Sequence, residues 1–343
     1  MGTDDGDGRN THGRVKAGAI PPSNPTWLPG DDPRSRHGDI AAIVSDPAPT
    51  PASRIRRLCW KAGRRVALLI IILVTLRLTG CMERLFYAPQ RGPTPPPTGA
   101  EGVWFRAADG TRLFGWWLPA AGHGPDDPPA PTVIHVHGNA GNLPGHEFFS
   151  EHLPPAGFNV FLFDYRGYGQ SEGSARSRDA LIADTHAALD TVLARRDVDP
   201  ARIALYGHSL GGAIACNVAA DRMEVAALVL ESPFDSWRNA AATAIGGDPP
   251  FFLARWLAWL LIADHRRPDD ALHRYRGPVL ILHGEADTIV PPGHGRRLAA
   301  RAGDRAELHL YPGGVHNELQ ATHPRTRKTM IEFLRRHLHV GGI

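Results

Sequence analysis

Residues 203–212 read Ile-Ala-Leu-Tyr-Gly-His-Ser-Leu-Gly-Gly, an apolar strand pattern that runs into a serine, Ser209, flanked by glycines. A helical pattern of small residues follows and ends near Asp221. A sharp turn from strand to helix strains the backbone at the serine and needs small neighbours, here Gly207 and Gly211. It would expose the hydroxyl at a helix N-terminus, where negative charge is favoured. Ser209 is therefore a candidate nucleophile, and the alternative is an ordinary serine N-cap.

Two later strand patterns end in loops that carry an acid and a base. Asp287 follows one of these strands and His316 follows the next, so the chain order is Ser, Asp, His. A serine nucleophile needs a base, and the base needs an orienting acid. Because all three residues follow strand ends, we expect them at one edge of a parallel sheet. Glu285 is the alternative acid, and we prefer Asp287.

A glycine-rich turn follows the strand pattern Val133–Val136. It reads His-Gly-Asn-Ala-Gly-Asn over residues 137–142. An oxyanion hole takes one backbone amide from such a loop and another from the residue after the nucleophile. We therefore expect the amides of Asn139 and Leu210 to converge. A phosphate-binding loop is disfavoured, since no Lys-Ser/Thr pair follows the glycines.

From residue 132 onward, short apolar strands alternate with helical patterns, which indicates βαβ units and a parallel sheet. The Asp109-Gly110 pair predicts a hairpin between residues 101–106 and 112–118. The other predicted strands are 132–136, 159–164, 203–206, 226–231, 279–283 and 307–311. Helices are expected near 142–152, 178–195, 209–221, 294–302 and 324–338. The fold class is thus α/β, with a mostly parallel central sheet and helices on both faces.

Five motifs together resemble the α/β hydrolases of the BEM46 and ABHD13/ABHD17-like group: His137-Gly-Asn-Ala-Gly-Asn142, Asp164-Tyr-Arg-Gly-Tyr-Gly169, Gly207-His-Ser-Leu-Gly-Gly212, His283-Gly-Glu-Ala-Asp287 and Val315-His-Asn317. The resemblance extends from about Trp104 to His337. It implies Ser209 as nucleophile, Asp287 as acid, His316 as base, and oxyanion amides from Asn139 and Leu210. No cofactor and no metal is implied, since these three side chains and two backbone amides suffice for acyl transfer. Members of the group are assigned as esterases, lipases and thioesterases, and often only as hydrolases without an assigned reaction, so the resemblance leaves the substrate open.

The first part of the chain is predicted to be a targeting segment. Residues 1–53 are polar and proline-rich and are expected to be disordered. Basic residues from Arg54 to Arg65 precede the apolar run Val66–Leu76, which suits a signal peptide better than a spanning helix. Leu78-Thr79-Gly80-Cys81 then resembles a bacterial lipoprotein box, with Cys81 as the lipidated residue. The alternative is an uncleaved signal anchor; both predict membrane attachment and an exported domain.

We divide the remainder into a proline-rich spacer over 82–100 and a hydrolase domain over 101–343, with a small helical cap at about 236–272. The cap contains a strongly apolar stretch, 251–262, expected to be a helix that packs on the domain or contacts acyl chains or a bilayer. These features predict a serine hydrolase that cleaves esters or thioesters of a small or lipid-like acyl substrate. A peptidase or amidase of the same fold, or a noncatalytic tethered protein, are the alternatives.

Charge and cysteine content exclude other classes. Residues 1–80 hold 12 Lys and Arg against 7 Asp and Glu, which leaves 26 basic and 28 acidic residues in the rest of the chain. The basic excess lies in the leader, so a nucleic-acid partner is disfavoured. The 3 cysteines, Cys59, Cys81 and Cys216, have no zinc or disulfide spacing, and Cys216 lies in an apolar run typical of a buried core.

Overall fold

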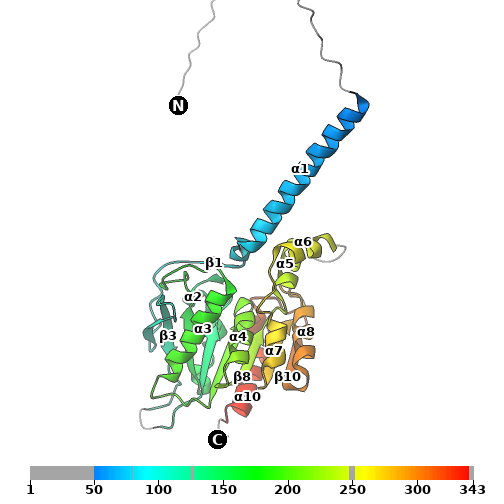
Figure 1. Cartoon of the computed structure of the whole chain (residues 1–343). Coiled ribbons are helices and arrows are strands. Elements are labelled where there is room, and N and C mark those ends of the chain that lie inside the picture. Colours follow the sequence, from blue (N-terminus) through cyan, green and yellow to red (C-terminus); the bar gives the residue numbers. More distant parts are fainter. Residues whose placement is uncertain (1–49, 80, 125–126, 247–251, 340–343) are drawn as a thin grey trace, which may run out of the picture. The chain divides into compact units, whose positions relative to one another are not determined.

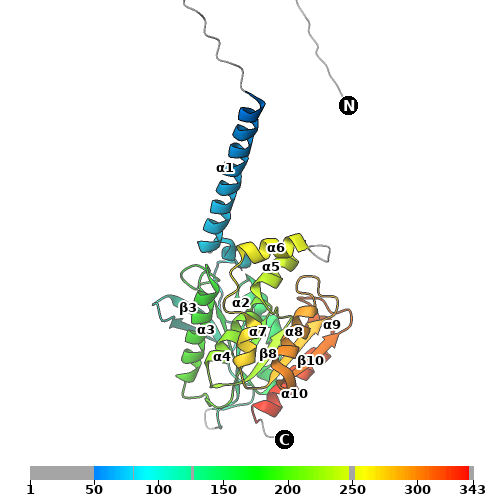
Figure 2. The same ribbon diagram turned by 45° about the vertical axis from the view of Figure 1, so that its right-hand side comes forward.

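The computed structural model describes residues 50–79, 81–124, 127–246 and 252–339. The chain divides into two compact units, Met1–Leu58 and Cys59–Ile343. Most of the segment expected to be disordered, 1–53, lies outside the described residues, and helix α1 (Pro51–Leu78) begins inside its last part. Figures 1 and 2 show the sheet and its helices in the second unit.

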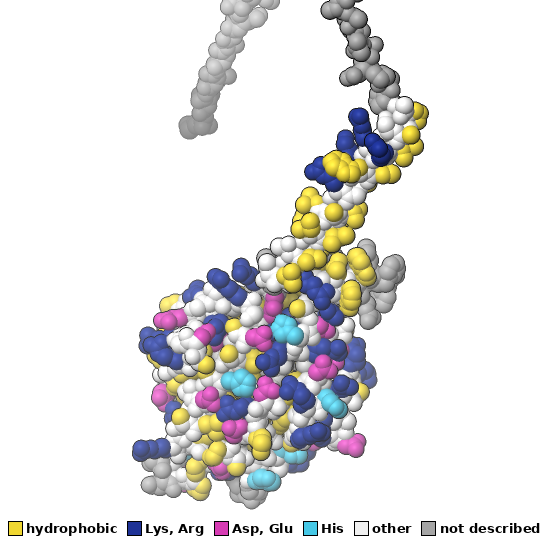
Figure 3. Space-filling model, in the orientation of Figure 1, with side chains coloured by type: hydrophobic (Ala, Val, Ile, Leu, Met, Phe, Trp, Pro, Cys, Tyr) yellow, Lys and Arg dark blue, Asp and Glu magenta, His cyan; other side chains and the backbone are white. Residues whose placement is uncertain are grey.

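Helix α1 carries the basic and apolar stretches of the predicted leader as one element of 28 residues with no buried side chain. Basic side chains gather toward its N-terminal end and apolar ones along the rest (Figure 3). Among the exposed apolar residues, Leu69, Ile70 and Ile71 are each more than half exposed. In the part of the chain that the structure describes, no helix has the length and apolar character needed to cross a membrane.

The central sheet has eight strands in the order β10-β9-β8-β7-β4-β6-β3-β2. β2 pairs antiparallel with β3, β3 pairs antiparallel with β6, and the other neighbours are parallel. The predicted α/β-hydrolase fold is therefore confirmed, including the hairpin at Asp109-Gly110. The strands are β2 (Glu101–Arg106), β3 (Arg112–Leu118), β4 (Thr132–Val136), β6 (Asn159–Asp164), β7 (Ile203–His208), β8 (Val225–Glu231), β9 (Val279–Gly284) and β10 (Ala306–Tyr311).

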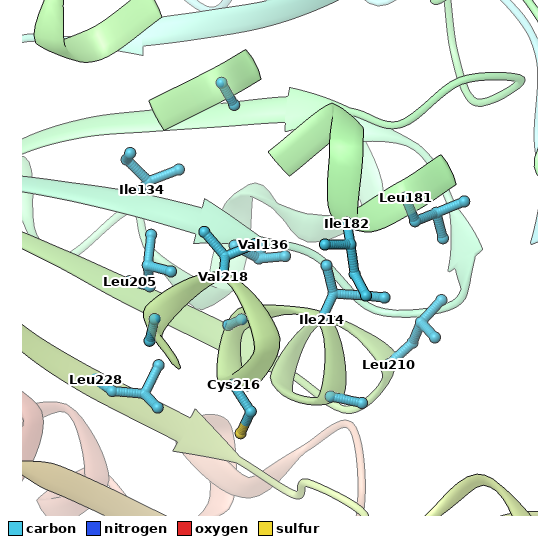
Figure 4. Close-up of a cluster of buried hydrophobic side chains, with 14 of the residues drawn as sticks. Ile134, Val136, Leu181, Ile182, Leu205, Leu210, Ile214, Cys216, Val218 and Leu228 are labelled. Atoms are coloured by element: carbon cyan, nitrogen blue, oxygen red, sulfur yellow. The ribbon is translucent and has the colours of Figure 1, made fainter. Parts of the chain in front are cut away.

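Alternate side chains of the buried strands enter two separate cores, as the two-residue period of a strand requires. On β4, Ile134 joins the core under α3, α4, α7 and α8, whereas Val133 joins the core under α10. Figure 4 shows part of the first core, with Ile134 and Leu205 on the strands and Ile214 and Val218 on α4. The helices are α2 (Leu143–His146), α3 (Arg178–Leu193), α4 (Leu210–Asp221), α7 (Pro268–Arg274), α8 (Gly293–Ala302), α9 (Leu319–Thr322) and α10 (Arg325–His337).

The predicted cap contains two helices, α5 (Trp237–Gly246) and α6 (Phe252–Leu261). α6 has two different faces. Ala258, and Ile262 just after the end of the helix, are buried in the first core. Trp256 and Trp259 are 57% and 55% exposed. The apolar stretch therefore packs on the domain with one side and presents aromatic rings to the surroundings with the other.

The predicted spacer lies on the domain. Residues 81–86 form a 3-10 helix, and β1 (Ala88–Pro89) pairs in parallel with β5 (Ala140–Gly141) in a second, two-stranded sheet. The indole of Trp116 donates a hydrogen bond of 3.0 Å to the carbonyl of Thr94, which is fully buried. Thus the proline-rich chain is held along much of its length.

Candidate active site

Ser209 occupies the turn between β7 and α4 in a strained conformation. Its φ is 52° and its ψ is −114°, a region that costs a residue with a side chain about 1–3 kcal/mol. The flanking glycines are required here, because a Cβ at Gly207 would lie 2.6 Å from the carbonyl oxygen of Gly211. A Cβ at Gly211 would overlap the carbonyl of Val136. The sharp strand-to-helix turn that the glycines predict is therefore present, and we call it the elbow.

The Ser209 hydroxyl contacts the candidate base, His316, and does not cap helix α4. Although Ser209 is the N-cap residue of α4, its side chain makes no capping hydrogen bond. Its Oγ lies 3.0 Å from Nε2 of His316, and Nδ1 of His316 lies 2.7 Å from Oδ2 of Asp287. A carboxylate can only accept, so Nδ1 carries the proton and the neutral ring accepts from Ser209 at Nε2. The geometry favours the nucleophile interpretation over the N-cap alternative.

Backbone hydrogen bonds join the loops that carry the acid and the base. The amide of Ala286 donates to the carbonyl of Gly314 at 2.9 Å, and the amide of Glu285 donates to that of Tyr311 at the same distance. Asp287 is 3% exposed and His316 is 7% exposed. The alternative acid, Glu285, has an exposed side chain and contacts Arg296 at 3.5 Å instead.

The environment of Asp287 keeps its carboxylate charged. Burial would raise its pKa, but His283, whose Nε2 lies 3.5 Å from Oδ2, and the hydrogen bond from His316 outweigh burial and hold the pKa well below its usual range. The other oxygen, Oδ1, accepts from the amides of Ile289 and Val290 at 3.0 and 2.8 Å. The carboxylate is thus fixed with Oδ2 toward the imidazole.

The glycine-rich loop that carries Asn139 begins beside the start of α4. A Cβ at Gly211 would come within 2.6 Å of the His137 carbonyl oxygen, so the helix start and the loop are in close contact. Within the described residues, the amides of Asn139 and Leu210 donate to no other group. Both amides are therefore candidates for the predicted oxyanion hole. The side chain of Asn139 is engaged elsewhere: its Oδ1 accepts from the amide of Ala88 at 2.9 Å.

Two residues of the motif Asp164–Gly169 make hydrogen bonds to the glycine-rich loop and to the residue that follows it. The Tyr165 hydroxyl is buried and donates to the carbonyl of His137 at 2.8 Å. The Asp164 Oδ1 accepts from the amide of Leu143 at 3.1 Å. Burial raises the pKa of Asp164 to about 8, so this acid holds its proton near neutral pH.

The remaining histidines near the site have structural contacts. His283 donates from Nε2 to the Val290 carbonyl at 2.7 Å, and His137 donates from Nδ1 to the Gly138 carbonyl at 2.8 Å. His208 lies 3.4 Å from the backbone oxygen of His316, and burial holds the pKa of His208 well below its usual value. His294 pairs with Asp235 at 2.5 Å. In the described ranges, no group of three or more His, Cys, Asp or Glu side chains could hold a metal ion.

One buried group was not anticipated from the sequence. Glu231 ends β8 and is fully buried, where its Oε2 accepts from the Tyr206 hydroxyl at 2.6 Å and from Gln320 at 2.8 Å. Its backbone oxygen accepts from the amide of Ser209 at 2.9 Å. The available clue was an acid at the end of an otherwise apolar strand. The predicted lipidation residue, Cys81, has a side chain that lies outside the described part of the structure.

Comparisons with known proteins agree with this architecture. The profile of the alpha/beta hydrolase fold family matches residues 131–260, and that of serine aminopeptidase S33 matches residues 252–321. YfhR of Escherichia coli K12 is 38% identical over 244 residues, 70% of this chain and 82% of its own. The alpha/beta hydrolase domain-containing protein WAV2 of Arabidopsis thaliana is 30% identical over 78% of this chain and 92% of its own. The chain belongs to the α/β-hydrolase family. The bem46 protein of Schizosaccharomyces pombe is 33% identical over 55% of this chain and 62% of its own, which supports the predicted BEM46 resemblance.

Solved structures of other proteins share the fold of this α/β-hydrolase at low sequence identity. The Pyrococcus furiosus esterase Pf2001 aligns with a TM-score of 0.59 at 21% identity, covering 74% of this chain and 98% of its own. A puromycin-hydrolyzing peptidase of Mycobacterium tuberculosis aligns with a TM-score of 0.55 at 20% identity, covering 71% of this chain and 40% of its own. At these identities the alignments support the fold alone.

Proposed function

We propose that this α/β-hydrolase cleaves carboxylic ester or thioester bonds through an acyl-enzyme formed on Ser209. The observation that carries the proposal is the continuous relay from the Ser209 Oγ through His316 to Asp287, with distances of 3.0 and 2.7 Å. Such a relay activates a hydroxyl that is otherwise a weak nucleophile. The strained backbone at Ser209 and the close contact between the start of α4 and the glycine-rich loop support a role for the amides of Asn139 and Leu210 as the oxyanion hole.

In the proposed reaction, Ser209 Oγ attacks the carbonyl carbon while His316 Nε2 accepts the hydroxyl proton. The amides of Asn139 and Leu210 stabilise the negative charge on the carbonyl oxygen. The tetrahedral intermediate then expels the alcohol or thiol, which takes the proton from His316. Water repeats the sequence on the acyl-enzyme: His316 accepts its proton, the acid leaves, and the proton returns to Ser209.

An ester or thioester is favoured over a peptide by the charge of the cap. An aminopeptidase needs an acidic group for the substrate amine. The acids described between residues 233 and 272 are already paired with basic side chains: Asp235 with His294 and Arg297, Asp264 and Asp269 with Arg267, and Asp270 with Arg301. The exposed rings of Trp256 and Trp259 instead suit a lipid-like acyl group.

We further propose that the reaction takes place at a membrane to which the chain is attached by its leader. The exposed apolar side chains of α1 and the basic residues before them support this. In one form of the proposal, cleavage before Cys81 leaves this residue lipidated at the new N-terminus; in the other, the leader remains as an anchor. Mass spectrometry of the mature protein separates the two, because an intact Leu78-Thr79-Gly80 excludes lipidation at Cys81.

The enzymatic proposal is tested with p-nitrophenyl esters of short and long acyl chains and with a fluorophosphonate probe, which labels activated serines. Wild type should turn over the esters and react with the probe, and Ser209→Ala should do neither. The exposed Ser174 provides a matched control, since Ser174→Ala removes the same hydroxyl from a surface position. Equal activity of wild type and Ser209→Ala would remove Ser209 from the mechanism. Absence of probe labelling in the wild type would favour a noncatalytic tethered protein.

A further inference from the structure

The segment that follows the leader crosses the domain beside the glycine-rich loop. We call residues Glu83–Gly92 the strap. Its strand β1 pairs with β5, which lies inside the loop that carries Asn139. On its other side, the carbonyl of Gln90 accepts from the amide of Gly169 at 2.9 Å. The strap therefore runs between the glycine-rich loop and the turn that follows β6.

Two backbone amides of the strap hold the loop. The amide of Ala88 donates to Oδ1 of Asn139 at 2.9 Å, and the amide of Gln90 donates to the carbonyl of Gly141 at 3.0 Å. Successive amides of a strand point to opposite sides, so these two face the loop together. Pro89 lies between them, at the position whose missing N–H would point away from the loop. Between Ala88 and Gln90, the strap therefore offers amide donors only toward the loop.

A buried ion pair fixes the start of the strap. Oε1 of Glu83 accepts from Nε of Arg178 at 2.8 Å and from the Arg178 amide at 2.6 Å. Arg178 is fully buried, and its guanidinium lies 4.2 Å above the ring of Trp237, the first residue of cap helix α5. The ring of Phe86 contacts Trp237 edge-on at 5.5 Å between centroids. One cluster thus joins the strap, the start of α3 and the base of the cap.

We propose that the strap is a positioning element of the oxyanion hole. By accepting from Ala88, the Asn139 side chain is held on the strap side of the loop, which leaves the Asn139 amide free to face Ser209. Stabilisation of an oxyanion depends on amides that are oriented before the reaction begins, and a shift of about 1 Å can cost about 100-fold in rate. This inference rests on the proposed function and adds to it that residues next to the leader set its rate.

The test removes single strap amides in the full-length protein. Ala88→Pro deletes the donor to Asn139, and Gln90→Pro deletes the donor to Gly141. Thr98→Pro is the matched control. Thr98 precedes Gly99, whose φ is +86°, in a turn closed by the Ala100 amide on the Pro97 carbonyl at 3.0 Å. Proline is favoured at that position of such a turn.

Each strap variant should lower kcat by about 10-fold or more with KM changed less than about threefold, because an interaction that acts in the transition state is lost. Thr98→Pro should match wild type. Hydrogen exchange of residues 137–142 supplies a readout independent of turnover, and it should accelerate in Ala88→Pro and Gln90→Pro. A kcat that matches the control would overturn the proposal, whether exchange accelerates or not.

Two further comparisons keep the outcome clear. If Ala88→Pro fails to fold, Asn139→Ala removes the same hydrogen bond from its acceptor end and keeps the backbone amide. Because Tyr168 also donates to Asn139 Oδ1, at 3.3 Å, Tyr168→Phe is the control for that contact. If wild type neither hydrolyses esters nor reacts with a fluorophosphonate, the proposed function fails. The exchange experiment then still decides whether the strap holds the loop.

Discussion

Replacing Asp287 by asparagine tests the proposed relay at its acid, where the structure fixes the orientation of the new side chain. Oδ1 of Asp287 accepts two backbone amides, from Ile289 and Val290. An asparagine placed with its NH₂ group at that position would leave both buried amides without an acceptor, at about 1–3 kcal/mol each. The amide oxygen must therefore take the place of Oδ1, and the NH₂ group must face His316.

That orientation disables the base. Facing an NH₂ donor, Nδ1 of His316 becomes the acceptor, so the proton moves to Nε2 and the ring can no longer accept from Ser209. We expect kcat to fall by about 10⁴-fold, as for the corresponding change in serine proteases, which is equivalent to about 5.4 kcal/mol. The thermal midpoint should fall, because the interactions that lower the pKa of Asp287 stabilise the charged carboxylate and are lost with the neutral amide, while the shape and both backbone hydrogen bonds limit the loss.

The assay is kcat for p-nitrophenyl acetate, with the His316 tautomer read from nitrogen NMR shifts. Glu285→Gln is the matched control, because it makes the same chemical change two residues away on an exposed side chain that contacts only Arg296 among the described acid-base pairs. It should retain wild-type activity. An Asp287→Asn enzyme within about 10-fold of wild-type kcat would refute the relay, since the wrong tautomer cannot supply that rate.

Three other changes probe the surrounding structure. Glu83→Gln leaves a buried guanidinium without its charged partner and should lower the free energy of unfolding by about 3–5 kcal/mol, whereas Glu101→Gln, at an exposed ion pair, should cost about 1 kcal/mol or less by denaturant titration. The pKa of Asp164 is raised to about 8 by burial, so its contribution to stability is present below about pH 4 and lost as the pH rises toward 8. In wild type, this effect lowers the free energy of unfolding by about 1.4 kcal/mol for each pH unit, and Asp164→Asn should abolish it. The free energies of unfolding are measured by urea titration from pH 5 to 8; the same dependence on pH in both proteins would contradict this. Gly211→Ala should prevent folding, because its Cβ would overlap the backbone at the end of β4; a stable, active variant by circular dichroism and ester turnover would show that the elbow tolerates a side chain.

The fold could be predicted because its signals are local. Alternation of buried strands with helices, and glycines at sharp turns, follow from the two-residue period of strands and from the space that each turn leaves. The same logic placed Ser209, Asp287 and His316 at one sheet edge, since residues that follow parallel strands emerge together. The structure brings these three into contact and leaves Glu285 outside. Their catalytic roles remain predictions for the experiments above.

The contacts that hold the site could not be predicted, because they join segments far apart in the sequence and use groups common to every residue. The proline-rich stretch after the leader has the composition of a spacer, and its two amide donors, at Ala88 and Gln90, have no side-chain signature. Glu83 and Arg178 are 95 residues apart, and their pairing depends on the path between them. The composition of the proline-rich stretch predicts how it would behave as an isolated segment, but its hydrogen bonds to the domain depend on tertiary packing.

At residue 139, the side-chain contacts explain a choice of residue that the proposed chemistry does not require. Stabilising an oxyanion through a backbone amide requires no particular side chain, so the chemistry alone does not explain an asparagine at this position. The structure supplies a reason: Oδ1 of Asn139 accepts from the Ala88 amide and from the Tyr168 hydroxyl, and a short side chain that ends in a carbonyl can reach both. Aspartate would offer the same oxygens but would place a charge beside the proposed oxyanion and oppose its formation. A neutral acceptor of this length is therefore what a loop needs when its side chain must be held and its amide must remain free.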